Sequence, residues 1–283
     1  GEKGGYFTRN MRQNTPVKTT KLPLGRETDY PQKYAPETLC PIARSDSREP
    51  LGIGKPLPFR GVDIWNAWEL TWLGDNGHPK VAVVEIRVPA DSPNLVESKS
   101  LKLYLGSFAM SRFADAAHVG KTIAADLSEC SGASVEVTLD PDILISTLHG
   151  PCIDGLDIDC ESWEVDAGLL VADERVAVEE SLHSHLLRSL CPVTGQPDMG
   201  SVEVRYTGPY IDPASLLRYI ASYREHNDFH EACVERMFVD IMKRCSPTSL
   251  SVYARYQRRG GIDINPFRSS RAERPENTRL WRQ

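Results

Sequence analysis

A thiol and a carboxyl group lie seven residues apart in the loop sequence CPVTGQPD, which runs from Cys191 to Asp198. A cysteine nucleophile with a nearby acid–base group is the smallest set of side chains that covalent catalysis requires. Each residue alone has an ordinary explanation, because a single cysteine is more often an inert buried residue and an aspartate in such a loop is typical of a turn. The pair together predicts an active site.

The reactive pair stands in the second of two related stretches. The matching segments are GHPKVAVVEIRV (77–88) with GQPDMGSVEVRY (195–206), 118 residues apart, and LYLGSF (103–108) with RYIASY (218–223), 115 apart. A repeat this long indicates two tandem modules rather than a short-repeat solenoid. At the first offset Leu73 and Lys80 replace Cys191 and Asp198, so we expect one active site that two related modules serve.

Three further polar clusters could take part in binding. His230 and Glu231 open a predicted helix, where Glu231 could equally be a surface residue that stabilises the helix dipole. The sequence ESKSLK (97–102) opens another helix; its carboxylate could accept hydrogen bonds from a guanine-like edge, and its lysines could hold a phosphate. The turn RRGG (258–261) is either a solvated hairpin or a phosphate site, since arginine binds phosphate through two parallel hydrogen bonds.

The sequence predicts no metal site. The seven cysteines include no pair with CxxC spacing, which favours a reduced protein without a disulfide framework. His226 and His230 are four residues apart, but no third ligand and no HExxH pattern accompany them. His183 and His185 are interpreted as solvated residues of a helix. There is also no GxGxxG sequence and no P-loop, so a bound nucleotide would not be held by a Rossmann domain.

The elements that must position these residues follow one plan in both modules. Period-two alternation predicts strands at 79–90, 134–139, 200–208, 250–257 and 262–267. Apolar residues at three- and four-residue spacing predict helices at 100–113, 118–130, 178–190, 212–223 and 229–241. The expected class is α+β, with an antiparallel sheet and two helices on one face in each module. The predicted divisions are an extended lead-in (1–54), a first module (55–150) and a second module (151–283).

Composition excludes several classes of protein. The chain has 283 residues, of which 40% are hydrophobic and 25% charged, as in ordinary globular proteins. A net charge of −6 argues against a general binder of nucleic acid or anionic membranes. No apolar run approaches the length of a membrane helix, and the first residues lack an apolar signal region. We therefore expect a cytoplasmic protein with neither nucleic acid nor membrane as a partner.

Four stretches together closely resemble the NADPH-dependent 7-cyano-7-deazaguanine reductases, the nitrile reductases of queuosine biosynthesis, in their two-module form. They are ESKSLKLYL (97–105), SLCPVTGQPDMGSVEVRY (189–206), HNDFHEACVER (226–236) and SVYARYQRRGGIDINPF (251–267). The resemblance covers the chain from about Leu57 to the C-terminus. It implies two tandem tunnelling-fold modules, with the site at their junction and NADPH as the cofactor.

The resemblance also implies residue roles. Cys191 would attack the nitrile carbon to give a covalent thioimide, and Asp198 would protonate the nitrogen. The substrate-binding residues would be Val96, Glu97, Ser98, His230 and Glu231. The residues that hold NADPH would be Ser98, Lys99, Arg259 and Gly260.

Three alternatives stay open from the residues alone. A pterin-forming cyclohydrolase would need a Cys/His zinc site, for which no spacing is right. A cysteine hydrolase or amidase would use water in place of NADPH. A non-enzymatic tRNA-binding or assembly module would not depend on Cys191. The resemblance further suggests a homodimer of two-module chains.

Overall fold

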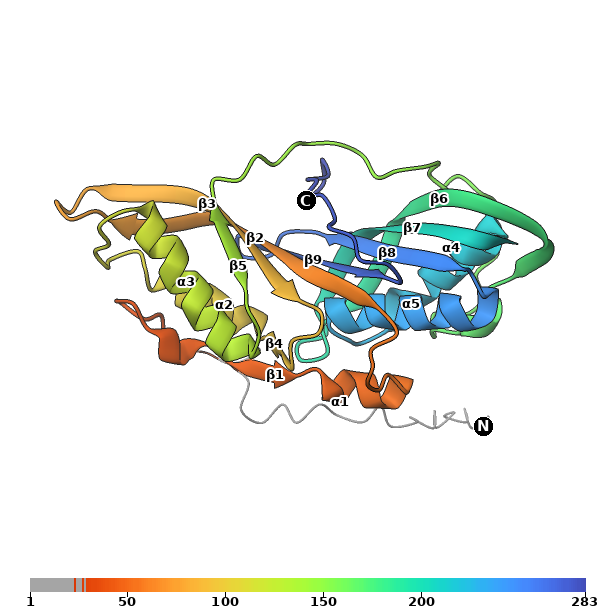
Figure 1. Cartoon of the computed structure of the whole chain (residues 1–283), viewed down its shortest axis with the longest axis horizontal. Helices are drawn as coiled ribbons and strands as arrows, with labels where there is room; N and C mark the ends of the chain where they lie inside the picture. The colour runs from red at the N-terminus through yellow and green to blue at the C-terminus, as the bar shows by residue number, and fades with distance from the viewer. Residues whose placement is uncertain (1–22, 24–26, 28) are drawn as a thin grey trace, which may run out of the picture.

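The computed structural model of the chain describes residues 23, 27 and 29–283. Its main sheet has seven antiparallel strands in the order β5-β3-β2-β9-β8-β7-β6, so one continuous sheet runs through both modules (Figure 1). The strands are β2 (Arg60–Leu73), β3 (Pro79–Pro89), β5 (Glu136–Leu139), β6 (Ala172–Leu190), β7 (Pro197–Ile211), β8 (Ser249–Tyr256) and β9 (Ile262–Ser269). The α+β class is confirmed.

Strands β2 and β9 join the two modules. They pair over eight residues, with Trp65 opposite Ile264 and Asp63 opposite Pro266. Because side chains alternate along a strand, Trp65 and Ile264 share one face of the sheet, and their neighbours share the other. The strand from the end of the second module therefore completes the sheet of the first.

Two helices per module cover the same face of this sheet. In the first module these are α2 (Ser98–Gly106) and α3 (Ala116–Ser131), and in the second α4 (Pro213–Ala221) and α5 (His230–Cys245). One apolar core forms between β2, β3, α2 and α3, and a second forms between β6, β7, β8, α4 and α5. This arrangement confirms the two helices predicted for each module. Short 3₁₀ turns are η4 (Ala167–Leu169) and η5 (Ser222–Glu225).

The first helix of each module begins at a residue whose carboxylate caps it. Asp212 caps α4 by accepting from the N–H groups of Ala214 and Ser215, and Pro213 occupies the first turn. The equivalent cap of α2 is Glu97. The same local structure therefore occurs at the same place in both modules.

The predicted helix at 178–190 is wrong, because this stretch is the second half of the 19-residue strand β6. Cys191 therefore follows a strand rather than a helix. His183 and His185 belong to that strand, so the prediction that they are solvated residues of a helix is also wrong.

The alignment of Leu73 with Cys191 is also off by one residue. Leu73 pairs with Pro79, whereas Leu190 pairs with Pro197. Leu73 and Leu190 also make the same pair of backbone hydrogen bonds with the segment that follows the first helix of their module. The structural counterpart of Leu73 is thus Leu190, because the loop after it is one residue longer in the second module. Cys191 corresponds to Gly74.

The lead-in was predicted to be extended, but its described part contains short elements. They are η2 (Pro36–Thr38), β1 (Pro41–Ala43), α1 (Ser45–Arg48) and η3 (Glu49–Leu51). Strand β1 pairs with β4 (Asn94–Val96), just before α2. The prediction for residues 1–22, 24–26 and 28 lies outside the described residues. The division points of the modules remain a prediction.

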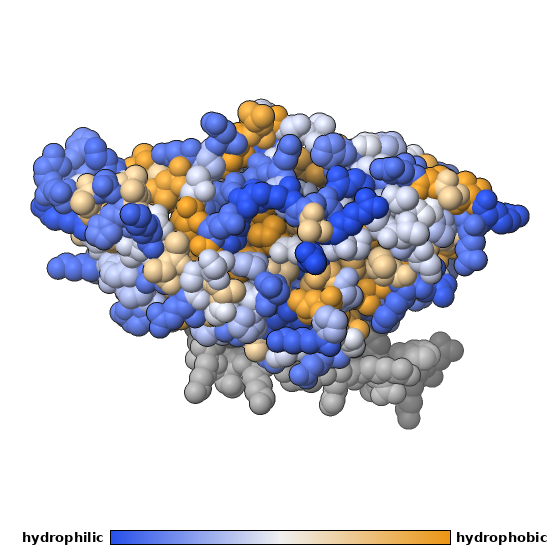
Figure 2. All heavy atoms as spheres, viewed as in Figure 1, coloured by the Kyte–Doolittle hydropathy of each residue, from blue (hydrophilic) through white to orange (hydrophobic). Residues whose placement is uncertain are grey.

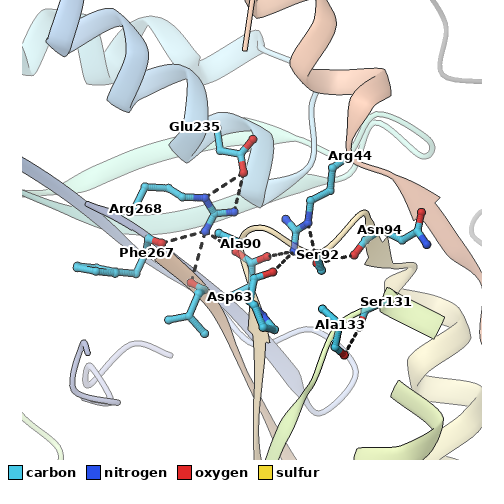
Figure 3. Close-up of polar contacts among 12 residues, drawn as sticks. Arg44, Asp63, Ala90, Ser92, Asn94, Ser131, Ala133, Glu235, Phe267 and Arg268 are labelled. Atoms are coloured by element: carbon cyan, nitrogen blue, oxygen red, sulfur yellow. Dashed lines mark hydrogen bonds and ion pairs between the residues drawn. The ribbon is translucent and has the colours of Figure 1, made fainter. Parts of the chain in front are cut away.

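A buried network of five charges joins the lead-in, the sheet and α5. Arg268 lies between two carboxylates, with 2.8 Å to Asp63 and 2.8 Å to Glu235 (Figure 3). Arg44 binds Asp63 at 2.6 Å and Arg48 binds Glu235 at 2.7 Å, and both come from the lead-in. Burial alone would raise the pKa of both carboxyl groups, but the neighbouring guanidinium groups hold the pKa of each below its usual range. Both acids are therefore ionised inside the protein.

Hydrophilic residues cover most of the face drawn in Figure 2, and hydrophobic atoms show in several separate groups. No helix in the part of the chain that the structure describes is long and apolar enough to cross a membrane.

The network predicts a large and local effect on stability. Replacing Glu235 with alanine leaves Arg48 and Arg268 buried without their partner, so the free energy of unfolding should fall by about 3–5 kcal/mol. The control is Glu136→Ala, which breaks a 2.8 Å pair with Arg274 whose side chains are 61% and 63% exposed. That change should cost less than about 1 kcal/mol. Urea denaturation measures both, and similar losses would contradict a stabilising role for the network.

Candidate active site

Cys191 and Asp198 face each other across the turn that joins β6 to β7. The turn is closed by hydrogen bonds between Cys191 and Gln196 (2.9 Å) and between Gly195 and Cys191 (2.9 Å). Gly195 has φ +69°, which glycine adopts at little cost. Asp198 is the second residue of β7, and both reactive side chains are buried. The predicted pair is therefore held on a rigid hairpin.

Asp198 is at the centre of a cluster of charged and polar side chains. One carboxylate oxygen lies 3.1 Å from Nε2 of His230, and the other lies 2.9 Å from Nε of Arg259. His230 comes from the first turn of α5, and Arg259 from the β8–β9 turn. Three separate elements thus bring an acid, a base and a guanidinium to one point.

His230 is fixed in orientation by packing. Its ring stacks on Tyr256 with 3.8 Å between centroids and 10° between planes. Its Nδ1 atom is buried and has no hydrogen-bond partner among the residues that the structure describes. Because a buried polar atom without a partner is costly, a ligand that bonds to Nδ1 would be favoured.

Glu231 lies beside His230 in the first turn of α5 and is buried. Burial, together with the nearby negative charge of Asp63, raises the pKa of Glu231 to about 7. Phe229, the N-cap residue of α5, makes no side-chain hydrogen bond to the first turn of the helix. A carboxylate here can therefore exchange a proton near neutral pH.

Glu97 occupies the N-cap of α2 with both carboxylate oxygens in use. They accept hydrogen bonds of 2.8 Å from the N–H groups of Lys99 and Ser100. Burial raises the pKa of Glu97 despite these bonds. A carboxylate has about four lone-pair directions, so both oxygens keep capacity for a further donor.

A cavity lined by residues of both modules opens between them. The predicted residues on its wall are Val96, Ser98, Cys191, Asp198, His230, Glu231 and Arg259. Glu97, Lys99 and Gly260 are sequence neighbours of wall residues but do not line the cavity themselves.

The cavity also contains residues that the site prediction omitted. Trp65, Phe229 and Gln257 contribute to its wall, and so does Lys102. Lys102 belongs to the ESKSLK cluster and follows Ser98 by one helical turn, so the i, i+4 spacing was the signal that could have found it. Trp65 gave no such signal, since only the pairing of β2 with β9 brings it to the site.

The donor set of the cavity fits a phosphorylated cofactor such as NADPH. Burial lowers the pKa of Lys102, and the positive charge of Arg259 lowers it further. An anion between the two cations would relieve this repulsion. Gly260 has φ +59°, and a side chain there would approach Lys102 to 3.0 Å. Glycine adopts this φ at little cost, whereas a side chain here would be strained and would press on the flexible end of Lys102.

The fold and the cavity define a class: a two-module α+β protein with a buried thiol and a cluster of Asp, His and Arg side chains at the module junction. Two family models match the chain. "Nitrile reductase, 7-cyano-7-deazaguanine-reductase N-term" covers residues 30–139, and "QueF-like protein" covers residues 197–275.

Several proteins named NADPH-dependent 7-cyano-7-deazaguanine reductase are similar over nearly their whole length. One from Paraburkholderia phymatum is 53% identical over 268 residues, which are 92% of this chain and 98% of that protein. One from Azoarcus sp. (strain BH72) is 54% identical over 267 residues, 92% of this chain and 95% of that protein. The chain belongs to the 7-cyano-7-deazaguanine reductase family of nitrile reductases.

The raised pKa of Glu231 predicts that the site costs stability at high pH. The folded protein holds the Glu231 proton up to about pH 7, whereas an unfolded glutamate loses it near pH 4.5. Stability should therefore fall as pH rises through this window, by at most about 3 kcal/mol. Glu231→Gln should be more stable than the parent above pH 7 and about equal below pH 4.5.

Thermal unfolding of both proteins across pH 4–9 measures this difference. The control is Glu174→Gln, on an exposed part of β6, which should leave the pH dependence unchanged. Parallel curves for the parent and Glu231→Gln would show that Glu231 does not titrate in this range.

Proposed function

We propose that this chain reduces the nitrile of 7-cyano-7-deazaguanine to an aminomethyl group with NADPH, a step of queuosine biosynthesis, in the cavity between its two modules. The observation that carries the proposal is the meeting of Cys191, the Asp198–His230 pair and Glu231 on one cavity wall. The names of the similar proteins supply the substrate and the reductant. Family membership favours a reductase over the cyclohydrolase, hydrolase and binding-module alternatives.

Cys191 acts as the nucleophile. Its sulfur attacks the nitrile carbon, and one bond of the carbon–nitrogen triple bond becomes a lone pair on nitrogen that takes up a proton. The product of this step is a thioimide, which is a better hydride acceptor than a nitrile. A thiolate and a positioned acid both lower the barrier, because a nitrile is a weak electrophile.

Asp198 delivers the proton to the nitrogen. Its position one hairpin turn from Cys191 supports this role, and its contact with Nε2 of His230 supplies a route for reprotonation. Arg259 holds the other carboxylate oxygen, so the side chain keeps one orientation while the proton moves.

Reduction of a nitrile to a primary amine takes up four electrons and four hydrogens. When bound, two equivalents of NADPH would supply the four electrons and two of the hydrogens as hydride, and the other two hydrogens would enter as protons. Ser98, Lys99, Arg259 and Gly260 form the proposed cofactor site, and the position of Lys102 supports its addition to the set.

Glu97 and Glu231 select the base. A guanine-like edge presents two N–H donors that a carboxylate accepts, and a site built for these bonds rejects analogues without them. Val96 and Ser98 flank Glu97, and His230 lines the nitrile end of the cavity. The raised pKa of both glutamates supports tighter binding as pH rises and the carboxylates ionise.

The homodimer stays part of the proposal. Its support here is that β5 forms one end of the sheet and pairs, among the described strands, with β3 alone. A second copy could cover that open edge.

The first test follows NADPH oxidation with 7-cyano-7-deazaguanine. We expect two NADPH consumed per nitrile and no consumption in Cys191→Ala, because the thioimide cannot form. Cys233→Ala, which removes a buried cysteine outside the cavity, is the matched control and should retain turnover. Nitrile loss without NADPH oxidation would support a cysteine hydrolase instead.

A second test separates proton delivery from binding. Asp198→Asn cannot donate the proton and should lower kcat by about 10²- to 10⁴-fold, while substrate affinity measured by calorimetry changes little. Asp228→Asn is the matched control, since Asp228 also lines the cavity but pairs with His226. Equal losses in both variants would argue against a specific role for Asp198.

A further inference from the structure

Three metal-ligating side chains gather at the outer edge of the sheet, away from the active site. Cys152, His183 and His185 each offer one ligand atom, and these atoms all lie within 4.8 Å of one another. None of the three lines the catalytic cavity. The spacing of these residues does not predict that they meet, because Cys152 lies about thirty residues from the histidines and the stretch that holds the histidines was predicted to be a helix.

The backbone fixes this arrangement. Residues 151–154 lie beside β6 as a short parallel bridge, with Cys152 opposite His183. The N–H of Ile153 donates to the His183 carbonyl (2.9 Å), and the N–H of His183 donates to the Pro151 carbonyl (3.1 Å). His183 and His185 are two residues apart on a strand, so their side chains project from the same face.

The second ring nitrogens are already engaged, as is typical of metal-binding histidines. Nδ1 of His183 lies 3.1 Å from the carbonyl oxygen of His149, so Nδ1 carries the proton and Nε2 keeps a lone pair. Nδ1 of His185 lies 2.7 Å from the hydroxyl of Ser201. When Nδ1–H of His185 donates to that hydroxyl, both Nε2 atoms are available as ligands.

We propose that Cys152, His183 and His185 bind one divalent ion of the zinc class. A thiolate and two imidazoles are a ligand set that zinc favours, with a fourth position left for water. Zinc distances of about 2.3 Å to sulfur and 2.0–2.1 Å to nitrogen would require the ligand atoms to draw together slightly. Cys152 is exposed, so the ion can enter and the Cys152 side chain can adjust.

The surrounding groups are compatible with a cation. Asp154 accepts from the N–H of His185 at 3.0 Å and places a negative charge beside the site, while Arg282 binds the His185 carbonyl from the other side. Binding converts the Cys152 thiol to a thiolate and releases one proton, so affinity should rise with pH.

The ion would fasten the connection between the modules to the edge strand. His185 precedes Cys191 by six residues on the same strand, a distance of about 20 Å along an extended chain. The metal would thus stabilise the strand that leads into the catalytic turn without contacting the reactants. It would also shield part of a sheet edge that is otherwise open to pairing with other chains.

The test uses the full-length protein stripped with a chelator and then dialysed against Zn²⁺ or Co²⁺. We expect about one equivalent of zinc by elemental analysis, a higher melting temperature with zinc, and a thiolate-to-cobalt charge-transfer band with Co²⁺. Cys152→Ser should weaken zinc binding by at least about tenfold, because losing a group that only hydrogen-bonds a metal ligand already costs about 10- to 100-fold. The same change should abolish the charge-transfer band.

Cys160→Ser is the matched control, because Cys160 lies in the same connection and outside the cluster. It should bind metal as the parent does, and both variants should keep NADPH-dependent turnover, which shows that they fold. Absence of retained zinc in the parent overturns the proposal. So does equal binding by Cys152→Ser, which would place the metal elsewhere, for example on Cys191.

Discussion

The buried charge network around Arg268 is the constraint on which the rest of the structure depends. It sits where β2 and β9 join the modules, and it connects that seam to α5 through Glu235 and to the lead-in through Arg44 and Arg48. Removing any member would leave a buried charge without its partner, which lowers the free energy of unfolding far more than the loss of an exposed ion pair does. The seam, the helix and the lead-in are therefore held in one relative position, and the catalytic cavity lies beside them.

The duplicated modules explain how one site arises from two copies. Both copies keep the same hairpin and the same carboxylate cap, Glu97 on α2 and Asp212 on α4. They diverge in the turn after the first long strand, where Gly74 in one copy corresponds to Cys191 in the other. The first module thus contributes the helix start with its lysines, and the second contributes Cys191 and Asp198, the proposed nucleophile and acid.

Much of the fold and most of the site could be predicted from the sequence, and the failures have physical causes. The leucines of the stretch 178–190, such as Leu182 and Leu186, recur at helical spacing and therefore predict a helix. In the structure a bulge between Ser184 and Leu187 interrupts the pairing of β6 with β7, so the alternation of a strand is broken there. Trp65 reaches the cavity only through the pairing of β2 with β9, about 200 residues apart, which local patterns do not record.

The same network that stabilises the seam also sets the electrostatics of the site. Asp63 is ionised because the guanidinium groups of Arg268 and Arg44 lower its pKa, and its negative charge helps to raise the pKa of Glu231. Glu231 is therefore poised between its charged and neutral forms near neutral pH, at some cost to the stability of the empty protein. A ligand that donates hydrogen bonds to the carboxylate recovers that cost on binding. Strong pairing in the seam thus makes it possible to leave a weakly satisfied acid in the cavity, where its unmet hydrogen-bonding capacity would favour the proposed substrate, which donates hydrogen bonds.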